Sequence, residues 1–279
     1  MEPGNHSDDH PAAVRPKPDG RRVPAPLREL GALLSGLAAP RREGAAAAWT
    51  PWMTLAVILL PLVLVLLHRW DAPIVRGAMT SDFWLMEGAR LVTSAVKAVA
   101  WLALAVVVWV LASFGLRGAD AAPWRRRIAR LHEFATFLIL SILVAGIPVE
   151  IGKRAAGRAR PALMDEYGSL HLEPFHGGHA FESFPSGHSM MTGILLVALW
   201  IFLPRWRGLV LPAALLMLLG RLAAGMHYPT DVVAGFAIGV VAAAWIARFM
   251  AGRGVIFRPL PGRGLPSLAA RPPRGAAGA

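Results

Sequence analysis

Long apolar runs separated by short polar segments dominate the chain from residue 44 onward. Residues 44–67 carry no charge, and the run 91–116 is interrupted only by Lys97, which lies close enough to one end to extend its amine to a membrane interface. A transmembrane helix needs about 17 to 25 residues, so the shorter runs require a few flanking residues to complete a crossing. We therefore predict an all-α integral membrane protein with a bundle of six transmembrane helices. The predicted spans cover residues 44–67, 91–116, 134–149, 189–204, 208–225 and 232–247.

The two ends of the chain differ from this pattern. Residues 1–43 mix charges of both signs with frequent proline, and their apolar patch at 30–37 is short and interrupted by glycine. We predict a mostly disordered N-terminal tail (1–43), a six-span domain (44–250) and a basic tail rich in proline and glycine (251–279). The start of the chain does not resemble a cleaved secretory signal, because no apolar run follows it directly.

Composition and charge narrow the class. Of 279 residues, 55% are hydrophobic and 16% charged, which is unlike a typical soluble domain. A formal net charge of +12 would suggest nucleic-acid binding in a soluble protein, but basic loops in a membrane protein set its topology, so we expect no nucleic-acid partner. Both tails and the segment 117–133 are basic, which predicts cytoplasmic termini in a bacterial plasma (inner) membrane. The absence of cysteine excludes thiol catalysis and Cys-ligated zinc.

The loop 152–188 is an exception to this charge rule, because it should face outside yet contains several cations. Lys153 and Arg160 are seven positions apart, so they can point at one target if the preceding helix continues outward. The fourth span opens with Pro-Ser-Gly-His, in which Ser186 can cap the helix, Gly187 permits a close backbone approach and His188 lies beside N–H groups that favour an anion. Taken singly, a lipid-facing basic cluster and an ordinary helix start are the simpler explanations.

A third polar block joins the fifth and sixth spans. Arg221 lies near the end of an apolar helix, where a charge needs a partner or a wet cavity. His227 and Asp231 are four positions apart, so the carboxylate could accept a hydrogen bond from one ring nitrogen and leave the other free to attack or to bind a proton. A loop histidine with a helix-capping aspartate is the alternative. Together the three blocks supply cations, a helix N-terminus and two histidines, which suits phosphoryl transfer and requires no metal.

In order and spacing, the three blocks resemble the signature of the type 2 phosphatidic acid phosphatase (PAP2) superfamily. They are Lys153-x6-Arg160-Pro161, Pro185-Ser186-Gly187-His188 and Arg221-x5-His227-x3-Asp231. The resemblance implies that His227 is the nucleophile, that Asp231 orients and activates it, and that His188 protonates the leaving group. It also implies phosphate binding without a metal or other cofactor, by Lys153, Arg160, Ser186, Gly187 and Arg221. Gly220 stands where the family commonly has serine, which removes one auxiliary hydrogen bond.

The resemblance implies hydrolysis of a lipid phosphate or pyrophosphate at the periplasmic, outer face of the membrane, through a phosphohistidine. Undecaprenyl pyrophosphate is the first candidate, since the need for it is broad in bacteria; phosphatidylglycerophosphate, phosphatidic acid and lipid A are the others. Transfer of the phosphoryl group to a lipid or sugar is an alternative, and a transporter or non-catalytic lipid-binding protein is a third hypothesis. Membrane lipids are the expected partners, with no obligate protein partner.

Two further patterns lie outside the signature. The loop between the first two blocks holds His171, His176 and His179 with Glu173, but their spacing fits no zinc pattern, so a substrate-facing lid or a hydrated loop is expected. The small-residue pattern of Gly235 to Gly239 in the sixth span predicts close helix packing, within one chain rather than between copies.

Overall fold

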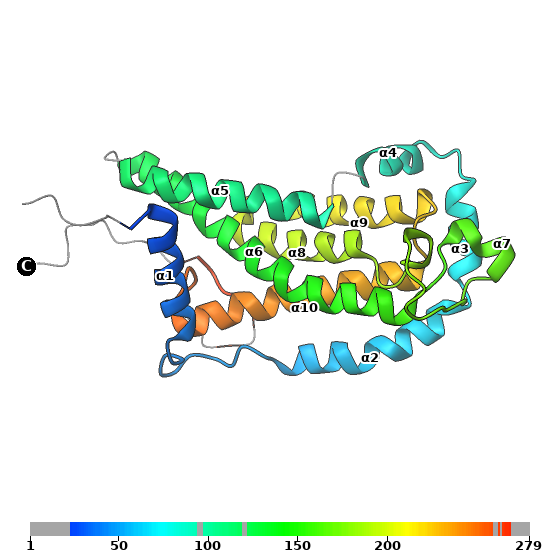
Figure 1. Cartoon of the computed structure of the whole chain (residues 1–279), viewed down its shortest axis with the longest axis horizontal. Coiled ribbons are helices and arrows are strands. Elements are labelled where there is room, and N and C mark those ends of the chain that lie inside the picture. The colour runs from blue at the N-terminus through cyan, green and yellow to red at the C-terminus, as the bar shows by residue number, and fades with distance from the viewer. Residues whose placement is uncertain (1–22, 94–96, 119–121, 259–261, 263, 269–279) are drawn as a thin grey trace, which may run out of the picture.

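The computed structural model describes residues 23–93, 97–118, 122–258, 262 and 264–268, which form an elongated helical bundle without β-strands in that part of the chain (Figure 1). The α-helices are α1 (Ala25–Ala38), α2 (Pro51–His68), α3 (Asp71–Met79), α4 (Trp84–Thr93), α5 (Ala98–Gly118), α6 (Ala122–Ala156), α7 (Met164–Tyr167), α8 (Gly187–Phe202), α9 (Arg207–Ala223) and α10 (Pro229–Arg253). Three short 3₁₀ helices, η2 (Pro161–Leu163), η3 (His179–Phe181) and η4 (Pro204–Trp206), lie between them.

The prediction of an all-α membrane protein is confirmed. Within the described residues, α2, α5, α6, α9 with the preceding η4, and α10 are long and apolar enough to cross a membrane. The sixth apolar helix, α8, has 16 residues and lies at the centre of the bundle, where it packs against α6, α9 and α10. The count of six spans therefore stays a prediction, since it depends on whether this shorter helix completes a crossing.

The structure corrects the boundaries of two predicted spans. The first begins at Pro51 and not at residue 44, because the segment 45–50 is not helical. The run 91–116 is divided: α4 ends at Thr93 and α5 begins at Ala98, directly after the exposed Lys97. The reason lies in Arg90 of α4, which donates hydrogen bonds to backbone carbonyls at the ends of α3 and α9 and so holds α4 at the end of the bundle.

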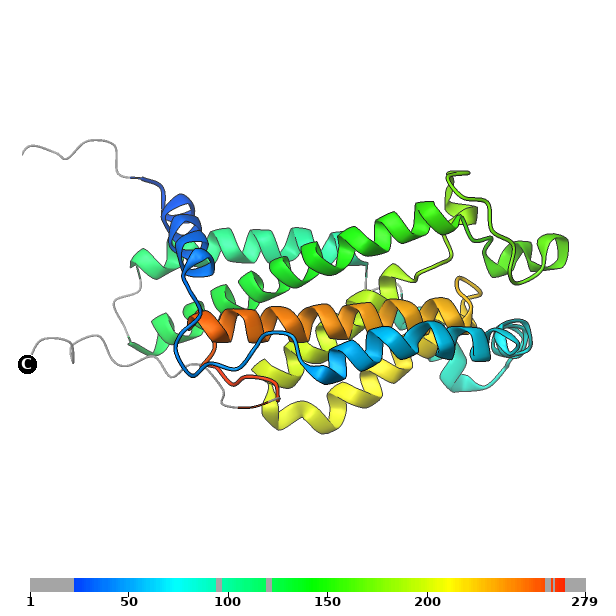
Figure 2. The same ribbon diagram turned by 90° about the horizontal axis from the view of Figure 1, so that it is seen from below.

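The N-terminal segment is also more ordered than predicted. Residues 1–22 lie outside the described part, but α1 is a helix within the region expected to be disordered. It crosses the other helices at a steep angle, at the end of the bundle opposite α3 and α7 (Figures 1 and 2). Ala25 is buried and Leu37 packs against the main core, whereas Leu27, Leu30 and Leu34 are exposed. Packing of one face of α1 against the rest of the protein thus stabilises a helix in a segment whose polar residues and prolines had predicted disorder.

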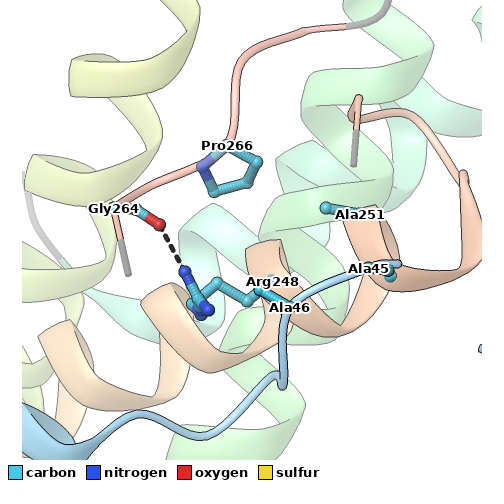
Figure 3. Close-up of a pocket in the computed structure, with 7 residues that line it drawn as sticks. Ala45, Ala46, Arg248, Ala251, Gly264 and Pro266 are labelled. Atoms are coloured by element: carbon cyan, nitrogen blue, oxygen red, sulfur yellow. Dashed lines mark hydrogen bonds between the residues drawn. The ribbon is translucent and has the colours of Figure 1, made fainter. Parts of the chain in front are cut away.

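Arg248, on α10, binds both the segment that precedes α2 and the segment that follows α10 (Figure 3). Its side chain is buried and donates hydrogen bonds to the carbonyl oxygens of Ala47, Ala48, Gly262 and Gly264. The predicted C-terminal tail therefore begins with an ordered segment that folds back on the bundle. Residues 269–279 of that tail lie outside the described part.

Glycines bring α8 and α10 into direct backbone contact. A Cβ atom on Gly235 would lie 2.1 Å from the carbonyl oxygen of Ser186, and one on Gly239 would lie 2.0 Å from that of Met190. On the facing helix, a Cβ on Gly193 would lie 2.5 Å from the carbonyl oxygen of Phe236. The prediction that Gly235 and Gly239 pack helices within one chain is confirmed, and this packing aligns the start of α10 with the start of α8.

Candidate active site

The polar blocks of the sequence meet at one end of the bundle. The C-terminal ends of α6 and α9 and the N-terminal ends of α8 and α10 gather there, beside α3 and α7 (Figures 1 and 2). The segments 157–186 and 224–228 connect these helices at the same end. All eight residues predicted for the site lie on these helix ends or on these segments.

The N-terminus of α8 has the predicted geometry. Ser186 caps the helix, with its hydroxyl oxygen 3.3 Å from the backbone N–H of Ser189, and its own N–H donates to the carbonyl of Asp231 at 3.0 Å. The Nζ of Lys153 lies 3.5 Å from the position that a Cβ on Gly187 would occupy, so a side chain there would contact the amine. The N-terminus of α8 therefore lies next to a cation, an arrangement that favours an anion.

Three cations converge on this point, and two of them lack carboxylate partners. Lys153 pairs with Glu150 at 2.6 Å, whereas neither Arg160 nor Arg221 forms an ion pair within the described part of the chain. Arg160 is buried and donates to the carbonyl oxygens of His179, Met226 and Glu182. Arg221 is 5% exposed, and its Nε has no hydrogen-bond partner among the described residues. Buried guanidinium groups without a paired carboxylate are costly, so this site is poised for an anionic ligand.

Arg160 does not reach the site by continuation of the Lys153 helix, as the seven-residue spacing had suggested. Lys153 is on α6, but α6 ends at Ala156, so Arg160 is not on the same helix. At Gly157 the backbone enters the left-handed region (φ +53°), where a Cβ would collide with the carbonyl of Glu173. The chain therefore turns before Pro161, and Arg160 is held by the backbone carbonyls described above instead of by helical periodicity.

His188 is half-buried at the second position of α8. It lies within electrostatic range of Arg221, His227, Arg160 and Lys153. In the part of the chain that the structure describes, its ring forms no hydrogen bond, so both ring nitrogens are available to a ligand bound among these cations.

His227 is fully enclosed, in the short loop before α10. Its Nδ1 lies 2.8 Å from the carbonyl oxygen of Ser183 and 3.8 Å from Oδ2 of Asp231. Because a carbonyl only accepts, Nδ1 carries the proton and Nε2 is left with a free lone pair. The predicted direct hydrogen bond from His227 to Asp231 is therefore corrected. Oδ2 of Asp231 instead accepts from the backbone N–H of Tyr228 at 2.8 Å and from the hydroxyl of Ser183 at 2.6 Å.

The protonation state of His227 provides a pH-dependent prediction. Burial lowers its pKa to about 4; Asp231 opposes this shift, while Arg160 and Arg221 add to it. We expect the ring to stay neutral as the pH falls from 8 to about 5 and to take up a proton only near pH 4. Nitrogen-15 NMR of histidine-labelled protein in detergent should show this, with His227→Gln used to assign the resonance. A midpoint near 6.5 would contradict the enclosed, cation-flanked environment.

Four buried polar residues of this region were not predicted from the sequence. Arg158 was noted only as one of several loop cations, and Asp71, Ser183 and Thr230 were not singled out at all. In the structure they form a hydrogen-bonded network around Asp231. A hint was available for Arg158, since a cation two positions before Arg160 is unexpected in a loop predicted to face outside.

The histidine-rich loop packs beside the site. The backbone of this loop forms hydrogen bonds with the segment 157–160, and one of them runs from the Ala159 N–H to the His171 carbonyl. Glu173 pairs with His171 at 2.9 Å and with His176 at 3.2 Å. Among the described residues, no three acidic or histidine side chains are grouped so as to hold a metal ion. The loop therefore forms a hydrogen-bonded cover over the segment that carries Arg160.

A helical membrane bundle that gathers cations, a helix N-terminus and a neutral histidine at one end has the features of a protein that binds and acts on a phosphate ester. Comparison with known proteins agrees with this class. The profile of the PAP2 superfamily matches residues 134–254, which include all three motifs. A lipid A 1-phosphatase of Rhizobium johnstonii is 30% identical over 222 residues, covering 79% of this chain and 90% of the relative.

Two more distant similarities were found. An undecaprenyl-diphosphatase of Sulfolobus acidocaldarius is 29% identical over 119 residues, covering 42% of this chain and 54% of the relative. The crystal structure of a transmembrane PAP2-type phosphatidylglycerolphosphate phosphatase from Bacillus subtilis is 23% identical, with a TM-score of 0.41, and covers 70% of this chain and 93% of that one. The chain belongs to the PAP2 superfamily and is a multi-pass membrane protein. Its relatives are named as phosphatases, which supports a phosphatase activity.

Proposed function

We propose that this protein hydrolyses the phosphate of a membrane lipid through a phosphohistidine formed on His227, without a metal ion. The observation that carries the proposal is the pairing of a neutral, enclosed imidazole with two buried arginines that lack carboxylate partners. A phosphate ester carries about two negative charges near neutral pH and would supply the missing counter-charge. A transporter or other non-catalytic protein would not need a histidine whose Nε2 lone pair is kept free.

The proposed reaction uses the hydrogen-bonding pattern of the site. Because Nδ1 of His227 donates to Ser183, Nε2 is the atom that attacks phosphorus, and the bond to the lipid oxygen breaks as the N–P bond forms. Lys153, Arg160 and Arg221, with the N–H groups after Ser186, hold the charged oxygens. His188 enters this step protonated, because the bound phosphate supplies the negative charge that the site otherwise lacks, and it donates that proton to the leaving lipid oxygen. It then takes a proton from the water that attacks phosphorus and releases His227.

Lipid A 1-phosphate is the first substrate to test. The polyprenyl pyrophosphate favoured by the sequence analysis is supported by a relative that covers 42% of this chain, whereas the named lipid A 1-phosphatase covers 79% of it. The longer match takes in more of the helices that would contact the lipid, so it bears more directly on substrate choice. Undecaprenyl pyrophosphate is the second candidate.

We further propose that the site faces the outer side of a bacterial plasma membrane and that both termini are cytoplasmic. The arginine-rich start of α6, including Arg125, Arg126 and Arg127, lies at the end of the bundle opposite the site. Clustered basic residues stay on the cytoplasmic side. The opposite end, with the candidate active site, then faces outward.

Phosphate release from defined lipids tests the proposed function. Purified protein in detergent, with EDTA present, should release phosphate from one of lipid A, undecaprenyl pyrophosphate, phosphatidylglycerophosphate or phosphatidic acid in clear preference to the others. Loss of all release in EDTA, restored by a divalent cation, would contradict the metal-free reaction. Release that requires an added lipid or sugar acceptor would replace hydrolysis with phosphoryl transfer, and no release under either condition would reject the enzyme.

A further inference from the structure

Asp231 is bound by groups other than the histidine that it was predicted to contact. Its Oδ1 accepts from Arg158 at 2.6 Å, and its Oδ2 accepts from the Ser183 hydroxyl and the Tyr228 N–H. The His227 ring is 3.8 Å away. Besides this electrostatic contact, the carboxylate is joined to His227 by hydrogen bonds through Ser183, whose hydroxyl donates to Asp231 while its carbonyl accepts from His227.

Arg158 connects this assembly to a distant part of the chain. One guanidinium nitrogen donates to Asp231, and the other donates to Asp71 at 2.8 Å, although Asp71 is 87 positions earlier, at the start of α3. Arg158 is 4% exposed and both aspartates are fully buried. Its guanidinium also lies 4.3 Å from the centre of the Tyr228 ring. Burial disfavours the charged form, but the two aspartates outweigh it and raise the pKa of Arg158 above its ordinary value.

Asp71 also holds the start of α10 directly. It accepts hydrogen bonds from the backbone N–H of Thr230 at 3.0 Å and from the Thr230 hydroxyl at 2.6 Å. Thr230 precedes Asp231 in the first turn of α10. Asp71 thus fixes both the arginine that binds Asp231 and the helix turn that carries it.

We propose that Arg158, braced by Asp71, is a positioning residue for the reaction of His227. Asp71 fixes Arg158, Arg158 fixes Asp231, Asp231 fixes Ser183, and the Ser183 carbonyl sets the tautomer and direction of the imidazole. The helix α3, which lies outside the three sequence motifs, thereby contributes to the geometry of the nucleophile. This inference rests on the proposed function.

Arg158 differs in this respect from the cations that face the phosphate site. Its hydrogen-bonding nitrogens are occupied by Asp71, Asp231, Thr230 and the carbonyl of Ser169. By contrast, Arg221 has a buried nitrogen without a partner among the described residues. Arg158 should therefore govern the rate of the chemical step and leave substrate binding unchanged.

The test compares Arg158→Gln and Asp71→Asn with the wild type on the lipid that the wild type hydrolyses best. Arg154→Gln is the matched control, because Arg154 is an exposed cation in the last turn of α6, four positions before Arg158. We expect kcat to fall about 10- to 100-fold in both variants, the size of effect that a small misplacement of a reacting group produces, with KM nearly unchanged. Arg154→Gln should behave as the wild type.

A double variant distinguishes positioning from general stability. If Asp71 acts through Arg158, the Asp71→Asn/Arg158→Gln protein should lose little more activity than the worse single variant. A lower melting temperature with unchanged kcat for the folded protein would overturn the proposal, as would a rise in KM alone, which would place Arg158 on the phosphate. Should Arg158→Gln fail to fold, Asp71→Asn and Ser183→Ala test the same chain of contacts. No phosphate release by the wild type would reject the proposed function itself.

Discussion

Replacing His227 with alanine is expected to reduce phosphate release at least about 10³-fold, with no change in the affinity for the lipid phosphate. The variant removes the imidazole and leaves Lys153, Arg160 and Arg221 in place, so the substrate should still bind. The rate should be measured under single-turnover conditions with the lipid that the wild type prefers, together with substrate binding.

The phosphohistidine itself should be detectable on the wild-type protein with phosphate-labelled lipid. Because a phosphohistidine is acid-labile, the reaction should be quenched with alkali, which should retain the label on the protein.

His176→Ala is the control for this experiment. His176 is 46% exposed on its side chain, lies in the loop beside the site and pairs only with Glu173 among acidic groups of the described chain. We expect this variant to keep wild-type activity and to carry the same label. Phosphate release that survives in His227→Ala would reject His227 as the nucleophile.

Substitution of Gly239 by alanine is expected to have the largest effect on stability. The new methyl group would lie 2.0 Å from the Met190 carbonyl oxygen, and this atom belongs to a helix backbone that cannot rotate away. The helices α8 and α10 must then separate, which costs about 1 to 3 kcal/mol for an overpacked core and more where backbone moves. The measurement is thermal unfolding in detergent, where the melting temperature should fall by several degrees.

Gly146→Ala provides the matched comparison on α6. No atom lies within 4 Å of the position that its Cβ would occupy. Alanine is also a better helix former than glycine, so this variant should melt at the wild-type temperature or slightly above it. Equal melting temperatures for Gly239→Ala and the wild type would show that α8 and α10 are not in backbone contact.

The apolar runs of the sequence predicted the positions of the long helices correctly. They predicted the first and last residues of these helices less well. The uncharged run 134–149 marked the core of α6, yet this helix continues to Ala156 because polar residues can remain helical outside the bilayer. The run 91–116 appeared continuous because hydropathy does not show hydrogen bonds. Those of Arg90 to carbonyls of distant segments hold α4 apart from α5. The order of α1 was missed for a similar reason, since it depends on packing against α5.

The residues of the candidate site were predicted more fully than their contacts. Motif spacing brought together His188, Arg221 and His227, because such spacing reflects short connections between adjacent helices. It could not show that Asp231, at the first turn of α10, would accept from the Tyr228 N–H and lie 3.8 Å from the His227 ring without a direct hydrogen bond to it. Nor could it find Asp71, whose bond to Arg158 joins positions 87 residues apart.

Arg248 has a practical consequence for anyone who shortens this protein. Its guanidinium depends on the carbonyl oxygens of Gly262 and Gly264, which lie well past the last apolar residues of α10. A truncation designed from hydropathy would stop before them and leave a buried cation with half of its acceptors. An affinity tag or a protease site is therefore better placed beyond residue 268, and the natural end of the membrane domain is set by an arginine's hydrogen bonds.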